Sequence, residues 1–155
     1  MGGEYEVLHH TEFFARLAAE GRLPVHRSTP TTAGAVTYHD PCYLARVGGV
    51  TEPPRQLLQI GLPNKLVEMP RRGAQTACCG AGGGRMWFDD KPAERIGASR
   101  VEEALATGAA TVAVSCPFCL TMLTDGMAGR NAVIQVRDIA EILADALPHA
   151  ASLDK

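Results

Sequence analysis

The five cysteines are the residues of this sequence with the clearest chemistry, and they fall into three groups along the chain. Cys42 stands alone, Cys78 and Cys79 are adjacent, and Cys116 and Cys119 form a C-x-x-C pair. The gaps that separate the three groups are 35 and 36 residues long. Thiolates are soft ligands that select zinc, Cu(I) or iron–sulfur clusters. We therefore expect three loops to meet at one metal site that uses all five thiols.

The C-x-x-C pair has two interpretations. It stands where a predicted strand passes into a predicted helix, and the positive potential of a helix start lowers thiol pKa values and favours metal-binding thiolates. Pro117, inside the pair, suits the first turn of a helix. A C-x-x-C near an α/β pattern is equally the signature of a redox dithiol. A metal-free dithiol reductase is therefore the weaker alternative, because three further cysteines accompany the pair.

A glycine-rich stretch follows the adjacent cysteines and ends at an arginine. Neighbouring side chains in an extended segment point apart, so both thiols reach one centre only if the backbone bends sharply. Glycine permits such a bend and lets the backbone approach a bulky inorganic group. The order of glycines fits neither a dinucleotide-binding loop nor a P-loop. We expect four residues of this stretch to contact the cofactor: Gly80, Gly82, Gly83 and Arg85.

His39 is the candidate catalytic residue, three positions before Cys42. A side chain with a pKa near neutrality can protonate a thiolate or donate a hydrogen bond to a cofactor. The alternative is a structural histidine at a strand end, bonded to the backbone. Trp87 and Phe88 are expected to pack rather than to conduct electrons, and His9 and His10 are expected to lie on the surface.

Short apolar strands that alternate with helices predict an α/β fold with a mainly parallel, Rossmann-like sheet flanked by helices. Strands are expected at 35–38, 65–69, 111–114 and 133–136. Helices are expected at 11–20, 51–60, 90–107, 117–125 and 138–147. Thr11 is the expected N-cap of the first, and Asp138 with Glu141 forms a capping box at the start of the last. Ligands of open α/β sheets bind at the carboxyl ends of the strands. We therefore expect the cysteine loops at the carboxyl rim of the sheet.

The composition sets the limits of domain organisation and location. The 155 residues suit one domain, with an N-terminal helix and linker over 1–34, a cysteine-rich domain over 35–150 and a disordered tail over 151–155. A formal charge of −2 without a basic run does not favour nucleic acid. Apolar runs fall short of the about 20 residues that span a bilayer. An odd cysteine count without a secretion signal predicts a cytoplasmic protein, held at the inner membrane face where a partner or missing region anchors it.

Three motifs resemble the cysteine-rich CCG domain family: Tyr38-His39-Asp40-Pro41-Cys42, Cys78-Cys79-Gly80-Ala81-Gly82-Gly83-Gly84 and Ser115-Cys116-Pro117-Phe118-Cys119. The family includes the B-type chain of heterodisulfide reductase and the iron–sulfur subunits of glycolate or lactate oxidase and anaerobic glycerol-3-phosphate dehydrogenase. Related oxidoreductases serve electron-transfer flavoprotein. Family members often carry two such domains and an upstream ferredoxin-like segment. With one domain and no C-x2-C-x2-C-x3-C run, this chain resembles a piece of a longer enzyme.

The resemblance implies a cofactor and a function. In the B-type chain of heterodisulfide reductase, similar motifs hold a non-cubane [4Fe–4S] cluster, whereas zinc and a cubane cluster each take four thiolates. The implied ligands are Cys42, Cys78, Cys79, Cys116 and Cys119. The implied function is electron transfer, or disulfide- or quinone-linked redox catalysis, in a multi-subunit oxidoreductase with flavin- or iron–sulfur-containing partner subunits. A zinc-binding structural or assembly module is the alternative.

Overall fold

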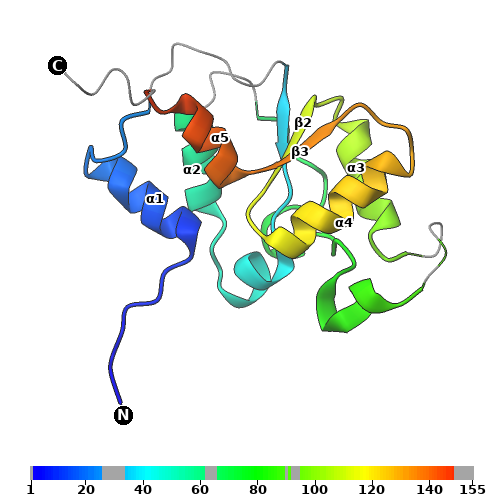
Figure 1. Ribbon diagram of the computed structural model, residues 1–155, viewed down its shortest axis with the longest axis horizontal. Coiled ribbons are helices and arrows are strands. Elements are labelled where there is room, and N and C mark those ends of the chain that lie inside the picture. Colours follow the sequence, from blue (N-terminus) through cyan, green and yellow to red (C-terminus); the bar gives the residue numbers. More distant parts are fainter. Residues whose placement is uncertain (1, 26–33, 62–65, 90, 92–94, 149–155) are drawn as a thin grey trace.

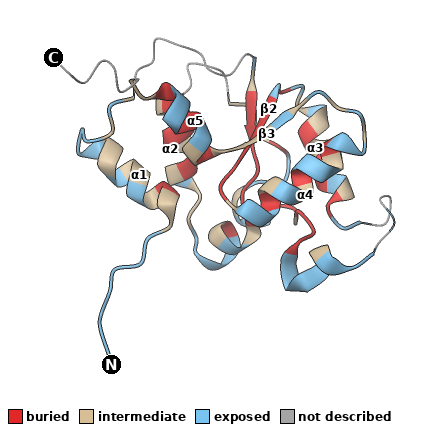
Figure 2. Ribbon diagram, in the orientation of Figure 1, coloured by how far each residue is buried: buried red, intermediate tan, exposed pale blue. Residues whose placement is uncertain are grey.

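A three-stranded parallel sheet forms the centre of the computed structural model, which describes residues 2–25, 34–61, 66–89, 91 and 95–148. The strands are β1 (Val36–Tyr38), β2 (Thr111–Val114) and β3 (Gln135–Asp138), in the order β1-β2-β3. β2 pairs with both neighbours, and its four residues are all buried (Figure 2). The predicted α/β fold with a parallel sheet is confirmed.

Helices cover both faces of the sheet (Figure 1). On one side lie α1 (His10–Ala19), α2 (Glu52–Gly61) and α5 (Ile139–Ala146), and on the other lie α3 (Ala98–Ala106) and α4 (Pro117–Ala128). Side chains of a strand alternate between faces. Accordingly, Val112 and Val114 of β2 pack in the core with α3 and α4, while Ala113 packs in the core with α2 and α5. Three short helical turns complete the described fold: η1 (Tyr43–Val47), η2 (Gly73–Gln75) and η3 (Gly82–Trp87).

The predicted strand at 65–69 is wrong. Lys65 lies outside the described residues, and only Leu66 bridges to β1, opposite Val36. The chain then leaves the sheet, because Glu68 pairs with Arg55 of α2 and Pro70 has no N–H for a ladder hydrogen bond.

The last predicted strand is displaced by two residues, since β3 starts at Gln135 and Val133 is almost completely exposed. The end of α4 explains the shift. Asn131 adopts a left-handed conformation with φ 51°, and the Ala132 N–H donates to the Met127 carbonyl. These residues are therefore used to close the helix before the strand can begin.

Helix boundaries differ from the prediction in several places. α1 is capped by His9 rather than Thr11, and Glu12 completes a capping box. The predicted helix at 90–107 starts only at Ala98, although residues 90 and 92–94 lie outside the described ranges. α2 begins one residue after Thr51, and α4 continues to Ala128. The capping box of Asp138 and Glu141 at the start of α5 is confirmed.

The predicted domain boundaries stay predictions. The linker lies mostly at 26–33 and the tail at 151–155, both outside the described residues. In the part of the chain that is described, no helix is both long enough and apolar enough to cross a bilayer.

Candidate metal centre

The cysteine groups occupy three loops beside the carboxyl ends of β1 and β2. Cys42 lies just beyond β1 and precedes η1, and the adjacent pair lies in the connection between η2 and η3. Cys116 is the N-cap residue of α4, and Cys119 stands in the first turn of that helix. The predicted position at the carboxyl rim therefore agrees with where the structure places these side chains.

A cavity of about 430 Å³ opens between the loops. Four cysteines line it, together with the backbone of the glycine-rich stretch and several apolar side chains. The lining residues that matter here are Cys42, Cys79, Cys116, Cys119, Gly82, Gly83, Gly84, Met86, Trp87 and Phe118. The fifth cysteine, Cys78, contacts Cys42 at the edge of this group.

The sulfur atoms form a continuous set of contacts. The Cys119 thiol donates to the Cys79 sulfur at a distance of 3.3 Å, and it also interacts with the Cys116 sulfur. Cys42 lies against Cys78 and near Cys79. The structure thus gathers all five predicted ligands at one place.

These contacts shift the thiol pKa values in opposite directions. Hydrogen bonds from the Cys119 thiol, and from the N–H groups of Cys119 and Phe118, lower the pKa of Cys116 to about 6. The Cys119 thiol likewise lowers the pKa of Cys79, and His39 adds to this effect. The pKa of Cys119 is raised because its proton serves both neighbours. Burial, followed by the adjacent sulfur atoms of Cys78 and Cys79, raises the pKa of Cys42. Two of the five sulfurs are therefore prepared as thiolates, the form that binds metals.

The donor set fits a group that takes several soft ligands. A tetrahedral zinc ion with Zn–S bonds of about 2.3 Å binds four sulfurs in close contact with one another. Here five thiols are available, one more than a zinc ion takes, and four of them line a cavity together with glycine backbone. The residues present therefore fit an iron–sulfur cluster better than one zinc ion.

The glycines after Cys79 provide the predicted bend. Gly80, Gly83 and Gly84 have φ values of 95°, 65° and 74°, a region that other residues rarely adopt. The Gly80 N–H donates to the Cys78 sulfur at 3.3 Å, so one backbone donor of this stretch already faces a thiol. Arg85 instead places its guanidinium over the ring of Phe88, 5.4 Å from its centroid.

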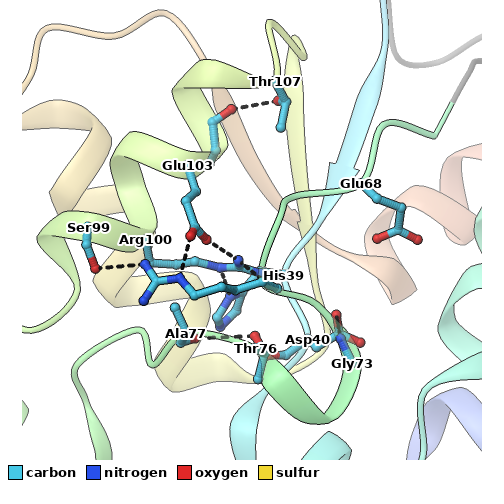
Figure 3. A network of polar contacts seen from close by, with 12 residues as sticks. His39, Asp40, Glu68, Gly73, Thr76, Ala77, Ser99, Arg100, Glu103 and Thr107 are labelled. Atoms are coloured by element: carbon cyan, nitrogen blue, oxygen red, sulfur yellow. Dashed lines mark hydrogen bonds and ion pairs between the residues drawn. The ribbon is translucent and has the colours of Figure 1, made fainter.

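Asp40 ties the Cys42 loop to the segment that leads to Cys78 (Figure 3). Its buried carboxylate accepts hydrogen bonds from Arg55 at 2.8 and 2.9 Å and from the Gly73 N–H at 2.8 Å. The Thr76 hydroxyl donates to the Asp40 carbonyl at 2.9 Å. Arg46 makes a second tie by donating to carbonyl groups of η2 and Thr76. These pairings could not be predicted from the sequence, because they join segments far apart in the chain.

His39 lies beneath the thiols and is almost completely buried. One of its ring nitrogens and the sulfur atoms of Cys79 and Cys119 all lie within 4.8 Å of one another. The alternative of a ring bonded to the backbone is wrong, because Arg100 Nε donates to His39 Nδ1 at 2.8 Å. The candidate catalytic residue therefore belongs to the site, together with an arginine that the sequence did not indicate.

Two expectations about aromatic and histidine side chains are wrong. Trp87 and Phe88 are 81% and 61% exposed, because η3 projects from the body of the domain. His9 and His10 are half-buried rather than on the open surface. His9 Nε2 lies 3.1 Å from the Ser115 carbonyl, so the start of α1 contacts the residue that precedes Cys116.

The region that holds the cysteine site matches a known protein family. Residues 36–124 match the CCG family, described as a cysteine-rich domain, and this match covers more than half of the chain. The protein belongs to the CCG family. The matched region of this CCG domain contains all five cysteines, both cysteine-bearing strand ends and η3.

Three curated relatives place the CCG domain in a wider context. It is 43% identical over 149 residues to the Bacillus subtilis protein named "Probable iron-sulfur-binding oxidoreductase FadF", covering 94% of this chain and 21% of that protein. It is 38% identical over 152 residues to the EtfAB:quinone oxidoreductase of Syntrophomonas wolfei, and the aligned region covers 92% of this chain and 21% of that protein. It is 41% identical over 143 residues to one subunit of the dihydromethanophenazine:CoB–CoM heterodisulfide reductase of Methanosarcina acetivorans. The aligned region covers 92% of this chain and 34% of that subunit. The CCG domain thus spans about a fifth to a third of the length of these relatives.

Proposed function

We propose that this CCG domain is the iron–sulfur module of a multi-subunit oxidoreductase. The observation that carries the proposal is the convergence of three cysteine loops on one cavity, which four thiols line with glycine backbone and apolar side chains, while the fifth thiol, Cys78, lies beside Cys42. The relatives named as iron–sulfur-binding and quinone- or heterodisulfide-linked oxidoreductases support the same class of function. When bound, an iron–sulfur cluster accepts and donates single electrons.

The proposed ligands are the five cysteines, and the cluster is a [4Fe–4S] cluster of non-cubane geometry. A cubane cluster takes four thiolates, so the fifth thiol of this set supports the non-cubane type. Cys79 and Cys119 provide buried sulfurs, whereas Cys42, Cys78 and Cys116 are partly exposed. Gly80 donates an N–H to a ligand sulfur, and Gly82 and Gly83 leave room for the group.

The position of the site supports exchange of electrons with a partner. Three exposed aromatic side chains line the cavity: Tyr43, Trp87 and Phe118. A cluster held here lies close to the protein surface, where a second redox centre can approach it. We propose flavin- or iron–sulfur-containing oxidoreductase subunits as partners, with a disulfide or a quinone as the terminal acceptor. A membrane-bound partner holds the domain at the inner membrane face in this scheme.

The test is a metal analysis of protein purified without oxygen. Iron, zinc and acid-labile sulfide are measured per chain, and an absorption spectrum is recorded on the same sample. About four iron and four sulfide per chain are expected, with broad sulfide-to-iron charge-transfer absorption. Loading is also expected to quench the fluorescence of Trp87, the single tryptophan of the chain, since its ring lines the cavity.

Two other outcomes decide against this proposal. About one zinc per chain without sulfide, retained after anaerobic reconstitution with iron and sulfide, identifies a structural zinc module, because zinc is d¹⁰ and has no redox chemistry. A metal-free protein that folds stably and reduces small disulfides identifies a dithiol reductase. Spectra of the reconstituted protein in the oxidised and reduced states then establish the geometry of the cluster.

A further inference from the structure

A chain of polar side chains runs from Glu103 of α3 through Arg100 to His39, beside the cysteine site, and Figure 3 shows these three residues. Glu103 accepts a hydrogen bond from Arg100 Nη1 at 2.7 Å, and Arg100 Nε donates to His39 Nδ1 at 2.8 Å. Arg100 and His39 are both almost completely buried, with exposed fractions of 0% and 1%. Nothing in the proposed ligand set requires an arginine here, so the chain needs an explanation of its own.

The chemistry of arginine determines where the imidazole carries its hydrogen. A guanidinium has five N–H donors and no acceptor, and it stays protonated in proteins. His39 Nδ1 must therefore accept the hydrogen bond through its lone pair. A ring whose Nδ1 accepts a hydrogen bond carries no proton on that nitrogen, so His39 is neutral in this arrangement. A neutral imidazole whose Nδ1 is an acceptor carries its single hydrogen on Nε2.

The Nε2 hydrogen needs an acceptor inside the protein. Among the described residues His39 Nε2 is buried and has no nitrogen or oxygen partner. The groups beside the ring are the sulfurs of Cys79 and Cys119, and Cys79 is the thiol with which His39 interacts. The Cys119 thiol donates to the Cys79 sulfur, so Cys79 is the accepting atom of this pair. A buried donor without a partner is costly, so the Cys79 sulfur is the natural acceptor.

His39 is excluded as a metal ligand for the same reason. Its distances to Cys79 and Cys119 would suit a mixed histidine–cysteine ion site. A ligating Nε2 needs its lone pair free, and the other ring nitrogen then donates its N–H to a carboxylate, a carbonyl or water. Here the partner of Nδ1 is a guanidinium, which can only donate. The ring is thus set up to donate to a ligand and not to be one.

We propose that Arg100 fixes the Nε2–H tautomer of His39, and that this N–H is a hydrogen-bond donor to the Cys79 sulfur at the metal centre. The metal part of this inference rests on the proposed function. Hydrogen bonds to ligand sulfurs withdraw electron density and raise the reduction potential of an iron–sulfur cluster. His39 and Arg100 are therefore positioning residues that tune the site.

The tautomer is read directly by nitrogen-15 NMR of the histidine rings, in the protein as purified and after removal of metal. The expected result is a protonated Nε2 and an unprotonated Nδ1 for His39. Arg100→Gln places a side-chain amide at Nδ1 that either donates or accepts, so a mixture of tautomers is expected. Glu103 keeps a partner in that variant, because Arg71 also pairs with it. Arg130→Gln, which removes a surface arginine paired with Glu102, is the matched control and leaves the tautomer unchanged.

The reduction potential of the cluster provides the second measurement. His39→Leu removes the donor, and a shift to more negative potential is expected at unchanged iron content. His39→Gln keeps an N–H donor in a similar position, and a potential close to that of the original protein is expected. Arg100→Gln should shift the potential in the same direction as His39→Leu, by a smaller amount, whereas Arg130→Gln should not shift it.

The two proposals fail in different ways. Absence of iron and sulfide from anaerobic protein overturns the proposed function, while the tautomer of His39 still decides whether Arg100 fixes the ring. A protonated Nδ1 in the original protein overturns the inference even if the cluster is present. Equal potentials for His39→Leu and the original protein also overturn it, because the hydrogen bond then has no effect on the centre.

Discussion

Gly97 packs directly against the carbonyl group of Cys79. A Cβ added to Gly97 would overlap the carbonyl oxygen of Cys79, and one added to Gly80 would lie 3.0 Å from the Gly97 nitrogen. The backbone before α3 therefore supports the cysteine loop from below without any side chain between them. Such a close approach of two backbones is possible only for glycine.

The first prediction concerns this contact. Gly97→Ala should destabilise the fold by about 1–3 kcal/mol, the usual cost of overpacking, and should lower the iron content because Cys79 is displaced. The φ of Gly97 is −68°, so the steric overlap alone causes the effect. Chemical denaturation and metal analysis measure the two quantities. Gly129→Ala is the control, since its φ is −63° and its added Cβ makes only an ordinary contact. Equal behaviour of the two variants would contradict the role of Gly97.

Elements determined by local signals could be predicted from the sequence. The strand Thr111–Val114 has a run of β-branched residues, and the capping box of Asp138 and Glu141 marks a helix start by itself. Both were predicted where the structure has them. The cysteine spacing also predicted one shared site, because a parallel sheet brings the carboxyl ends of its strands to one edge.

Elements determined by distant contacts could not be predicted. The helix α3 starts late because Gly97 is held against Cys79, a contact that no periodicity in the sequence indicates. The hydrogen bond from Arg100 to His39 joins residues 61 positions apart. The predicted strand at 65–69 is also affected by a distant contact. Only one bridge to β1 forms there, and Glu68 pairs with Arg55 of α2. The thiols could therefore be predicted from the sequence, whereas the polar side chains that hold them in place could not.

The second prediction tests the shared site. Serine in place of any one of the five cysteines should lower the iron and sulfide content of anaerobic protein by at least half, because a hydroxyl is a harder and weaker ligand than a thiolate. Cys79→Ser and Cys119→Ser should also reduce stability, since metal binding is coupled to folding and both residues are buried. Thr121→Ala, on the exposed side of α4, serves as the control. Full metal content in all five serine variants would rule out a site that uses them together.

The third prediction concerns the tie made by Asp40. Asp40→Asn should lower the free energy of unfolding by about 2 kcal/mol or more. The mostly buried guanidinium of Arg55 would then have Glu68 as its one remaining carboxylate partner among the described residues. It should also loosen Gly73 and the segment before Cys78, which hydrogen exchange of the Gly73 amide can detect. Asp145→Asn breaks an exposed pair with Arg137 and should change stability by no more than about 0.5 kcal/mol. A cost for Asp40→Asn as small as that of the control would show that the carboxylate does not organise the two loops.

The fourth prediction concerns the pH dependence of stability through His9. Its Nδ1 accepts from the Thr11 N–H at 3.3 Å as the cap of α1, and burial followed by the neighbouring His10 lowers its pKa below 6.5. Because the folded state holds this proton less tightly than the unfolded state, the contribution of the cap is fully present above pH 6.5. It is lost as the pH falls from there through the lowered pKa, since a protonated Nδ1 can no longer accept.

The expected loss is about 1 kcal/mol, the usual value of an N-cap. Denaturant unfolding at pH 7.5 and at pH 5.5 measures it. His9→Asn keeps a capping acceptor that does not titrate, so its stability should fall less over the same interval. His9→Ala should lose about 1 kcal/mol at pH 7.5 and show the same reduced pH dependence as His9→Asn. If all three proteins lose stability equally between the two pH values, the acid sensitivity arises elsewhere and His9 is not its source.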